Sequence, residues 1–215
     1  MAEYIVCGWY TPDYGHWWNV LRPTLEYHGA PHDFTEVNKR AGGWEVNTMA
    51  KPHQLLAAMD RHPDKVIVFI DVDCVVRAPL APLADIRADV AFYIRTKRKK
   101  THAKWGSIRS GTLIIRPTPH ARKFVEAWIA KGGAFAEVDQ NTLMLAMCDV
   151  PSCTFEALPV AYCAIPADKV ASPIILHDSA SAGIAKVGKL AKRLYRAGAP
   201  QWLINAMPAK RTSIN

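Results

Sequence analysis

The stretch Val66-Ile67-Val68-Phe69-Ile70-Asp71-Val72-Asp73 decides the fold. Its first five residues are apolar and mostly β-branched, which is typical of a strand buried on both faces of a parallel sheet. Two aspartates follow at positions i and i+2, so their side chains point the same way at the strand end. Open α/β sheets bind ligands beyond the carboxyl ends of their strands. The stretch therefore predicts an α/β fold with a ligand site at this end.

Asp71 and Asp73 predict a metal site, because two converging carboxylates repel each other unless a cation lies between them. Oxygen ligands suit Mg²⁺ or Mn²⁺, which also hold the phosphates of a substrate. The chain has 12 Asp, so about 0.7 Asp-x-Asp tripeptides are expected by chance. The position after a buried strand therefore carries the inference. The alternative is that one Asp caps a loop.

The rest of the chain alternates strands with helices. Further strands are expected at 4–7, 33–37, 90–94, 112–116 and 174–176, and helices at 17–27, 53–61, 120–130 and 139–147. Pro52 suits a first helical turn, Gly132-Gly133 a helix end, and Asp139 a helix N-cap. This alternation favours an α/β fold with a largely parallel sheet.

The net charge of +8 comes from two segments. Residues 95–123 hold ten Lys or Arg, residues 179–215 hold seven, and neither segment holds Asp or Glu. Such blocks predict either an anionic partner or a solvated face. No apolar run approaches the ~20 residues of a membrane-spanning helix, and the N-terminus lacks the features of a secretory signal. We therefore expect a cytoplasmic protein.

The five cysteines are odd in number and form no Cys-x-x-Cys pair. A disulfide framework or a zinc knuckle is therefore not expected. We interpret the cysteines as small buried apolar residues.

The segment VIVFIDVDCVVRAPL resembles the DxD segment of the nucleotide-diphospho-sugar transferases, the GT-A glycosyltransferases. Four further matches follow the order of that family: Lys51-Pro52 before the DxD strand, Ser110-Gly111-Thr112 before an apolar run, Asp139-Gln140 at a helix start, and Ile175-Leu176-His177-Asp178. The last is similar to the GT8-like branch. One departure is that Asp178 and Ser179 follow His177 in place of a short aromatic- or lysine-containing segment that closes on phosphate.

The resemblance implies a single GT-A (Rossmann-like) domain over residues 1–182, with a mostly parallel mixed sheet flanked by helices. A basic amphipathic tail over residues 183–215 would follow. The implied function is a metal-dependent glycosyltransferase. It would move a sugar from a nucleotide-diphosphate sugar, with a UDP-sugar favoured, to a glycan, glycolipid or other acceptor.

The resemblance also assigns roles to residues. Asp71, Asp73 and His177 would bind Mn²⁺ or Mg²⁺. The donor-binding set would be Tyr10, Thr11, Tyr14, Lys51, Asp71, Ser110, Gly111 and Thr112. Asp139 and Gln140 would act in catalysis, where a side-chain amide can stabilise developing charge beside the anomeric carbon.

Each role has a structural alternative. His177 would be a core histidine, Lys51 a solvated lysine at a helix start, and Asp139 a helix cap. The loop after the first strand, with Tyr10 and Tyr14, would be a turn held by core aromatics.

The basic segments have their own interpretations. Arg95 to Arg109, with Trp105-Gly106, would form a lid that holds diphosphate or an anionic acceptor, or else a solvated face. Residues 184–196 predict a basic amphipathic helix, followed by Trp202, that binds an anionic membrane surface at the inner face of a membrane. The family resemblance implies that the enzyme's acceptor would be lipid-linked. The alternative is that this helix packs on the domain.

Two other functions compete with glycosyl transfer. A nucleic-acid-binding module would use segments 95–123 and 179–215, but only one aromatic residue, Trp105, is interleaved with the first. A metal-dependent phosphoesterase would use the same aspartates. Such sites generally need more carboxylates, and the chain has only seven Glu.

Overall fold

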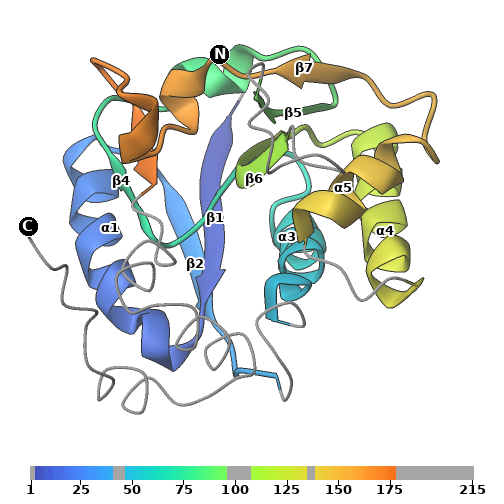
Figure 1. Cartoon of the computed structure of the whole chain (residues 1–215), viewed down its shortest axis with the longest axis horizontal. Coiled ribbons are helices and arrows are strands. Elements are labelled where there is room, and N and C mark those ends of the chain that lie inside the picture. The colour runs from blue at the N-terminus through green and yellow to red at the C-terminus, as the bar shows by residue number, and fades with distance from the viewer. Residues whose placement is uncertain (1–2, 41–46, 96–107, 135–138, 178–215) are drawn as a thin grey trace, which may run out of the picture.

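The computed structural model describes residues 3–40, 47–95, 108–134 and 139–177 (Figure 1). Its main sheet has six strands in the order β2-β1-β3-β6-β5-β7. The strands are β1 (Tyr4–Tyr10), β2 (His32–Glu36), β3 (Val66–Ile70), β5 (Val90–Ile94), β6 (Ile108–Ile115) and β7 (Phe155–Ala157). Only β6 is antiparallel to its neighbours among these strands. The predicted mixed, mostly parallel sheet is therefore confirmed.

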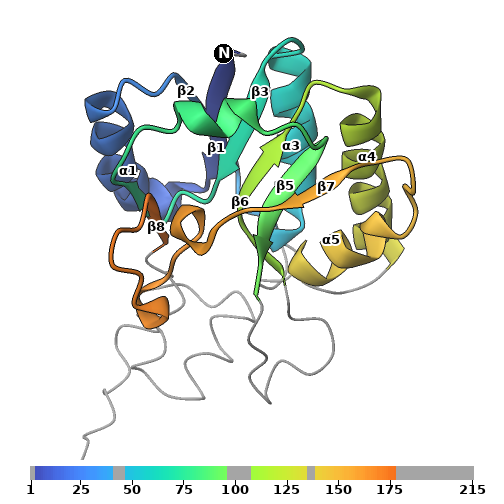
Figure 2. The same cartoon turned by 90° about the horizontal axis from the view of Figure 1, so that it is seen from above.

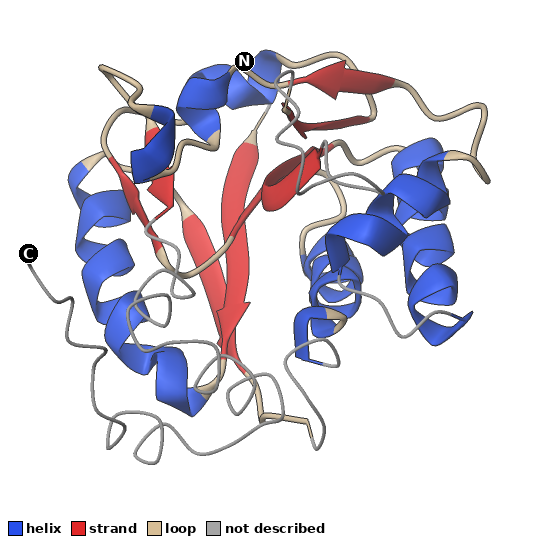
Figure 3. Ribbon diagram, viewed as in Figure 1, coloured by secondary structure: helices blue, strands red, loops and turns tan. Residues whose placement is uncertain are grey.

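Helices cover both faces of this sheet, as Figures 2 and 3 show. The α-helices are α1 (Gly15–Tyr27), α3 (Ala50–Arg61), α4 (Pro119–Ala134) and α5 (Asp139–Met147). On one face lies α1, together with a small antiparallel sheet of β4 (Cys74–Val76) and β8 (Ile175–His177). On the other face lie α3, α4 and α5. Short 3-10 helices span Pro12–Tyr14, Ala81–Asp85, Val160–Tyr162 and Pro166–Asp168.

The alternation of side chains along the central strands builds two cores. On β3, Ile67 and Phe69 pack with α3 and α4, while Val68 and Ile70 pack with α1 and β4. All five residues of β3 are buried. This two-sided burial is why the strand is apolar without interruption.

Several boundaries differ from the sequence expectation. Strand β6 begins at Ile108, four residues before the predicted strand, because Ile108 and Arg109 pair with β5. Helix α4 continues to Ala134 through the two glycines expected to end it. The three-residue strands β4 and β7 were not predicted, since they depend on partners elsewhere in the chain.

The cysteine expectation holds with one exception. All five cysteines are free, and four are buried, whereas Cys148 is exposed. Among the described residues, no helix is long and apolar enough to cross a membrane.

Candidate functional site

Three side chains with metal-ligating atoms meet beyond the carboxyl end of β3. Asp71 follows β3, Asp73 precedes β4, and His177 ends β8. One ligand atom from each residue lies within 4.8 Å of the other two. The pairing of β4 with β8 brings them together, because Cys74 lies opposite His177 in the antiparallel register. The three predicted ligands therefore form a cluster at the edge where the sequence predicted a site.

The hydrogen bonds of His177 fix which ring nitrogen is available. The Thr112 hydroxyl donates to the backbone oxygen of Tyr162 at 2.7 Å, so it accepts the hydrogen bond of His177 Nε2 at 2.9 Å. Nε2 therefore carries the ring proton, and Nδ1 keeps the lone pair that a metal needs. Burial, with the charges of Lys51 and Arg109, lowers the pKa of His177 to about 3. The ring is consequently neutral at physiological pH.

Lys51 is a buried cation that joins the end of β3 to the start of α5. Its Nζ lies 2.8 Å from Asp71 Oδ1 and 2.9 Å from Asp139 Oδ2. It also donates to the backbone oxygen and the hydroxyl of Ser110, at 3.2 and 3.1 Å. Only 5% of Lys51 is exposed, which rules out the solvated alternative. With its ammonium surrounded by these acceptors, phosphate binding by Lys51 stays a prediction.

The pKa values of this cluster reflect its burial and the negative charge of its neighbouring carboxylates. Burial raises the pKa of Asp71 to about 7, Asp73 and Asp139 add to the rise, and Lys51 opposes it. Burial alone would lower the pKa of Lys51, but Asp139 and Asp71 outweigh it and raise that pKa above its usual value. Among the described residues, the Lys51 ammonium contacts Asp71 and Asp139, and the carboxylate of Asp73 lies beside Asp71. A divalent cation held by Asp71, Asp73 and His177 would offset the negative charge of these carboxylates, so the donor set fits Mn²⁺ or Mg²⁺.

An irregularity in β6 aims its small residues at the cluster. On β6, Leu113 pairs with Phe92 of β5, but the next residue of β5, Tyr93, pairs with Arg109. The three residues Ser110 to Thr112 are therefore inserted between two pairs, which is the arrangement of a β-bulge. The inserted Ser110 reaches Lys51, and its hydroxyl donates to Asp139 at 2.6 Å. Inserted Thr112 holds His177.

Gly111, between Ser110 and Thr112, leaves room for the predicted metal ligands. Its backbone oxygen accepts a hydrogen bond from the Asp71 backbone N–H at 2.9 Å. A Cβ at this position would lie 2.9 Å from His177 Cε1 and 3.3 Å from Asp71 Oδ2. Glycine is therefore the residue that allows β6 to pass this close to the cluster.

Of the two predicted catalytic residues, Asp139 belongs to this cluster. It is 3% exposed, and its carboxylate accepts hydrogen bonds from Lys51 and Ser110. Its carboxylate is thus engaged by β6 and α3, in place of the predicted role as a helix cap. Gln140 is exposed beside it in the first turn of α5. Catalysis by either residue stays a prediction.

The loop after β1 holds the residues predicted to bind the nucleotide. Tyr10 stacks on Trp18 with ring centroids 6.0 Å apart, and both Tyr10 and Tyr14 pack against the core beneath α1. Thr11 is buried, and its hydroxyl donates to Asp13 at 2.5 Å. These contacts match the alternative of a turn held by aromatics. Nucleotide binding by this loop stays a prediction.

Arg109 differs from its sequence interpretation as a solvated or phosphate-binding residue. It is buried and forms an ion pair with Asp168, and it donates to the Cys163 backbone oxygen at 2.9 Å. Its guanidinium also lies over the Tyr93 ring, 5.0 Å from the centroid. Arg109 therefore joins β6 to the segment before β8. Residues 96–107, which make up most of the expected lid, lie outside the described residues.

Comparison of the fold with solved structures finds glycosyltransferases. A glycosyltransferase involved in glycosylation of the major capsid of PBCV-1 superposes with a TM-score of 0.65 at 12% identity, over 83% of this chain and 93% of that one. The galactosyltransferase LgtC, in complex with donor and acceptor sugar analogs, superposes with a TM-score of 0.54 at 12% identity. The match covers 80% of this chain and 86% of that one. GlyE of Streptococcus pneumoniae TIGR4 gives 0.56 at 15% identity, over 97% of this chain and 61% of that one.

No protein-family model and no curated protein sequence matches the chain. At these identities, the structural likeness shows the fold. This chain therefore has the GT-A glycosyltransferase fold that the resemblance implied.

Proposed function

We propose that this chain is a metal-dependent glycosyltransferase that uses a nucleotide-diphosphate sugar, with a UDP-sugar as the favoured donor. The observation that carries the proposal is the convergence of Asp71, Asp73 and His177 beyond the carboxyl end of β3. This edge of an open α/β sheet is where nucleotide ligands bind. The fold shared with solved glycosyltransferases supports the reaction class.

The side chains divide the work between them. Asp71, Asp73 and His177 would hold Mn²⁺ or Mg²⁺ at the donor diphosphate. When bound, such a cation neutralises charge on the departing nucleoside diphosphate. Lys51 keeps Asp71 in place from the buried side, and Gln140 lies exposed at the start of α5, where its amide would face the donor sugar.

Thermal unfolding with UDP, GDP and CDP, each with and without Mn²⁺, tests the proposal. We expect one nucleoside diphosphate, UDP, to raise the melting temperature only when Mn²⁺ is present, because ligands that bind the folded state stabilise it. Asp73→Asn should abolish this shift. Its apo stability should hold or rise, because the substitution removes like-charge repulsion at Asp71.

Asp85→Asn is the matched control, since Asp85 is exposed and lies outside the cluster. It should keep the Mn²⁺-dependent shift. If Asp73→Asn binds UDP and Mn²⁺ as tightly as the wild type, the metal role of the Asp pair is wrong. A shift with an oligonucleotide alone would instead support a nucleic-acid-binding module.

The acceptor is part of the same proposal. We propose that the acceptor is a glycan or a lipid-linked glycan at the cytoplasmic face of a membrane. The spacing of apolar and basic residues in 184–196, which is typical of a basic amphipathic helix, supports this location. These residues lie outside the described part of the chain. Co-sedimentation of the full chain with anionic vesicles tests this point, with a Lys189→Glu/Lys192→Glu/Arg193→Glu variant beside it. Equal, salt-insensitive sedimentation of both proteins would overturn it.

A further inference from the structure

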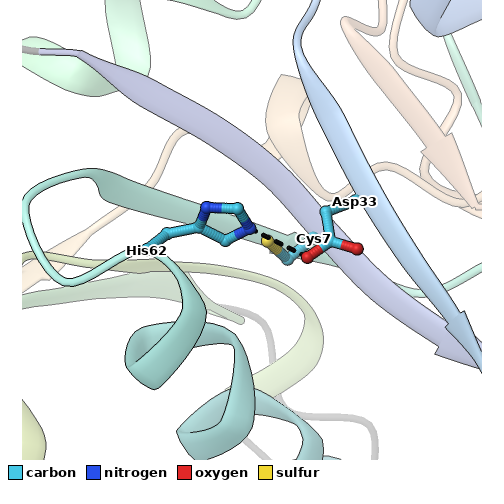
Figure 4. A group of neighbouring side chains, drawn as sticks. All are labelled: Cys7, Asp33 and His62. Atoms are coloured by element: carbon cyan, nitrogen blue, oxygen red, sulfur yellow. Dashed lines mark hydrogen bonds and ion pairs between the residues drawn. The ribbon is translucent and has the colours of Figure 1, made fainter.

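A second group of metal-ligating side chains lies at the other end of α3 from Lys51. Figure 4 shows Cys7, Asp33 and His62 with their side chains turned toward one another. Cys7 lies in β1, Asp33 lies opposite it in the parallel register with β2, and His62 follows the last residue of α3. One ligand atom from each lies within 4.8 Å of the other two. Three elements of the fold therefore deliver one thiol, one carboxylate and one imidazole to the same point.

We propose that Cys7, Asp33 and His62 form a second metal site, which binds Zn²⁺. Sulfur and imidazole nitrogen are ligands that zinc prefers, and a carboxylate oxygen completes a common zinc donor set. Mn²⁺ and Mg²⁺ prefer oxygen, so the thiol separates this site chemically from the cluster of Asp71, Asp73 and His177. The two sites would therefore select different metals.

The contact between His62 and Asp33 needs only a small adjustment to accept the ion. His62 Nε2 lies 2.8 Å from Asp33 Oδ2, which is a hydrogen-bond distance. In a tetrahedral site with Zn–N and Zn–O bonds of about 2.0–2.1 Å, these atoms would lie about 3.3 Å apart. The two atoms would therefore move apart by about half an ångström as a metal ion takes the place of the hydrogen-bonded proton. Figure 4 shows the sulfur of Cys7 beside this same contact.

Exposure leaves one side of the site open to solvent. Cys7 is fully buried, whereas the side chains of His62 and Asp33 are 21% and 29% exposed. Three protein ligands and an open fourth position for water give a four-coordinate zinc site. An ion can therefore enter from the side of His62 and Asp33 while the thiol closes the inner side.

Charge is balanced when zinc binds. Burial raises the pKa of the Cys7 thiol to about 12, Asp33 adds to the rise, and Arg61 opposes it. The thiol proton passes to solvent as the S–Zn bond forms. His62 Nε2 likewise gives up to solvent the proton it shares with Asp33, and the zinc-bound imidazole carries its ring proton on Nδ1. The thiolate and the Asp33 carboxylate then neutralise the ion. Arg61 Nε donates to Asp33 Oδ2 at 2.7 Å and its other nitrogen donates to Thr35. Arg61 would remain as the outer partner that orients the carboxylate.

Cobalt titration of the full chain tests the proposal, because a thiolate bound to Co²⁺ gives a charge-transfer absorption that oxygen ligands do not. The Asp73→Asn background removes one ligand of the oxygen-rich cluster. In that background we expect one equivalent of Co²⁺ to produce the band and one equivalent of Zn²⁺ to remove it. Cys7→Ser should abolish the band. His62→Gln, at a partly exposed position, should weaken Co²⁺ binding by more than about tenfold while the protein stays folded.

Cys153→Ser is the matched control, since Cys153 is another buried cysteine of the same core but lies outside both clusters. It should keep the band. Absence of the band, or a band that survives Cys7→Ser and His62→Gln, would overturn the proposal. The readout needs no nucleotide and no turnover, so it stands or falls apart from the proposed glycosyl transfer.

Discussion

Two clusters of three ligating side chains lie near the two ends of α3, and they differ in charge. Around Asp71, the described part of the chain places Lys51 together with the carboxylates of Asp71, Asp73 and Asp139, and burial raises the pKa of Asp71 to about 7. Around Asp33, burial alone would raise the pKa, but hydrogen bonds from His62 and Arg61 outweigh it and lower it. Among the described residues, Lys51 is the cation that pairs with Asp71 in the first cluster, and the pKa of Asp71 stays raised, whereas the partners of Asp33 in the second cluster lower its pKa.

The difference follows from where each cluster lies. Asp71 and Asp73 sit beyond the end of β3, where the chain has left the sheet and several loops meet. Cys7 and Asp33 lie opposite each other inside the ladder of β1 and β2. The open edge gathers two carboxylates and one imidazole, which suit a hard cation, whereas the packed face of the sheet gathers one thiol, one carboxylate and one imidazole. Helix α3 serves both, with Lys51 near its start and His62 after its end.

Replacing Lys51 should give the largest effect and touch only the first cluster. Lys51→Met leaves Asp71 and Asp139 facing each other without their shared cation. Removing one partner of a buried ion pair costs about 3–5 kcal/mol, and protonation of Asp71 should hold the loss near about 3 kcal/mol. Urea unfolding measures it. Lys65→Met is the control, since Lys65 pairs with the exposed Glu3. It should cost less than about 1 kcal/mol, and an equal loss in both variants would contradict the buried role of Lys51.

Gly111→Ala should disturb the first cluster sterically. The new Cβ would lie 2.9 Å from His177 Cε1 and 3.1 Å from Nδ1, so His177 must shift. We expect a loss of about 1–3 kcal/mol in the free energy of unfolding. Mn²⁺-dependent UDP binding should weaken by more than about tenfold. Gly15→Ala is the control, because nothing lies within 4 Å of a Cβ there. UDP binding by Gly111→Ala at wild-type affinity would show that β6 does not shape the site.

The sequence predicts those features of the fold that depend on a single strand and the residues at its end. Five apolar residues followed by Asp71 and Asp73 locate the central strand and the functional edge, because strand burial and ligand position are local consequences of that pattern. The role of Lys51 was not predictable. It looks like a solvated residue at a helix start, and only the packing of α3 against β6 and α5 buries it.

Contacts between distant segments account for the rest. The insertion of Ser110 to Thr112 in β6 depends on the register with β5, which no local pattern specifies. Cys7, Asp33 and His62 lie far apart in the sequence and show no metal-binding spacing. The parallel pairing of β1 with β2 and the end of α3 create that cluster. Register and helix length, more than residue type, are what sequence reasoning could not supply.

In the first cluster, Asp71 and His177 should change the free energy of unfolding in opposite directions as the pH varies. Asp71 has a raised pKa of about 7, so its contribution to stability is full below pH 3.8 and is lost as pH rises to about 7. His177 has a lowered pKa of about 3, so its contribution is present above pH 6.5 and is lost as pH falls to about 3. The two slopes oppose each other between pH 4 and 6.5 in the wild type.

Single substitutions should separate these slopes. Asp71→Asn leaves the His177 term, so its free energy of unfolding should rise more steeply with pH than that of the wild type over this window. His177→Gln leaves the contribution of Asp71, so its free energy of unfolding should fall with rising pH relative to that of the wild type. Urea unfolding of the metal-free proteins at a series of pH values measures both. Parallel pH profiles for the wild type and both variants would rule out the charge imbalance assigned to this cluster.

The smallest loss of stability is expected at the second cluster, where the ion pair of Arg61 with Asp33 is partly exposed to solvent. Arg61 Nε approaches Asp33 Oδ2 to 2.7 Å, as closely as Lys51 approaches Asp71, but 40% of the Arg61 side chain and 29% of the Asp33 side chain are exposed. Solvent screens such a pair, so Arg61→Ala should lower the free energy of unfolding by only about 0.5 kcal/mol. High salt should reduce the loss further. A salt-independent loss as large as that of Lys51→Met would show that burial is not what distinguishes the ion pairs at the two ends of α3.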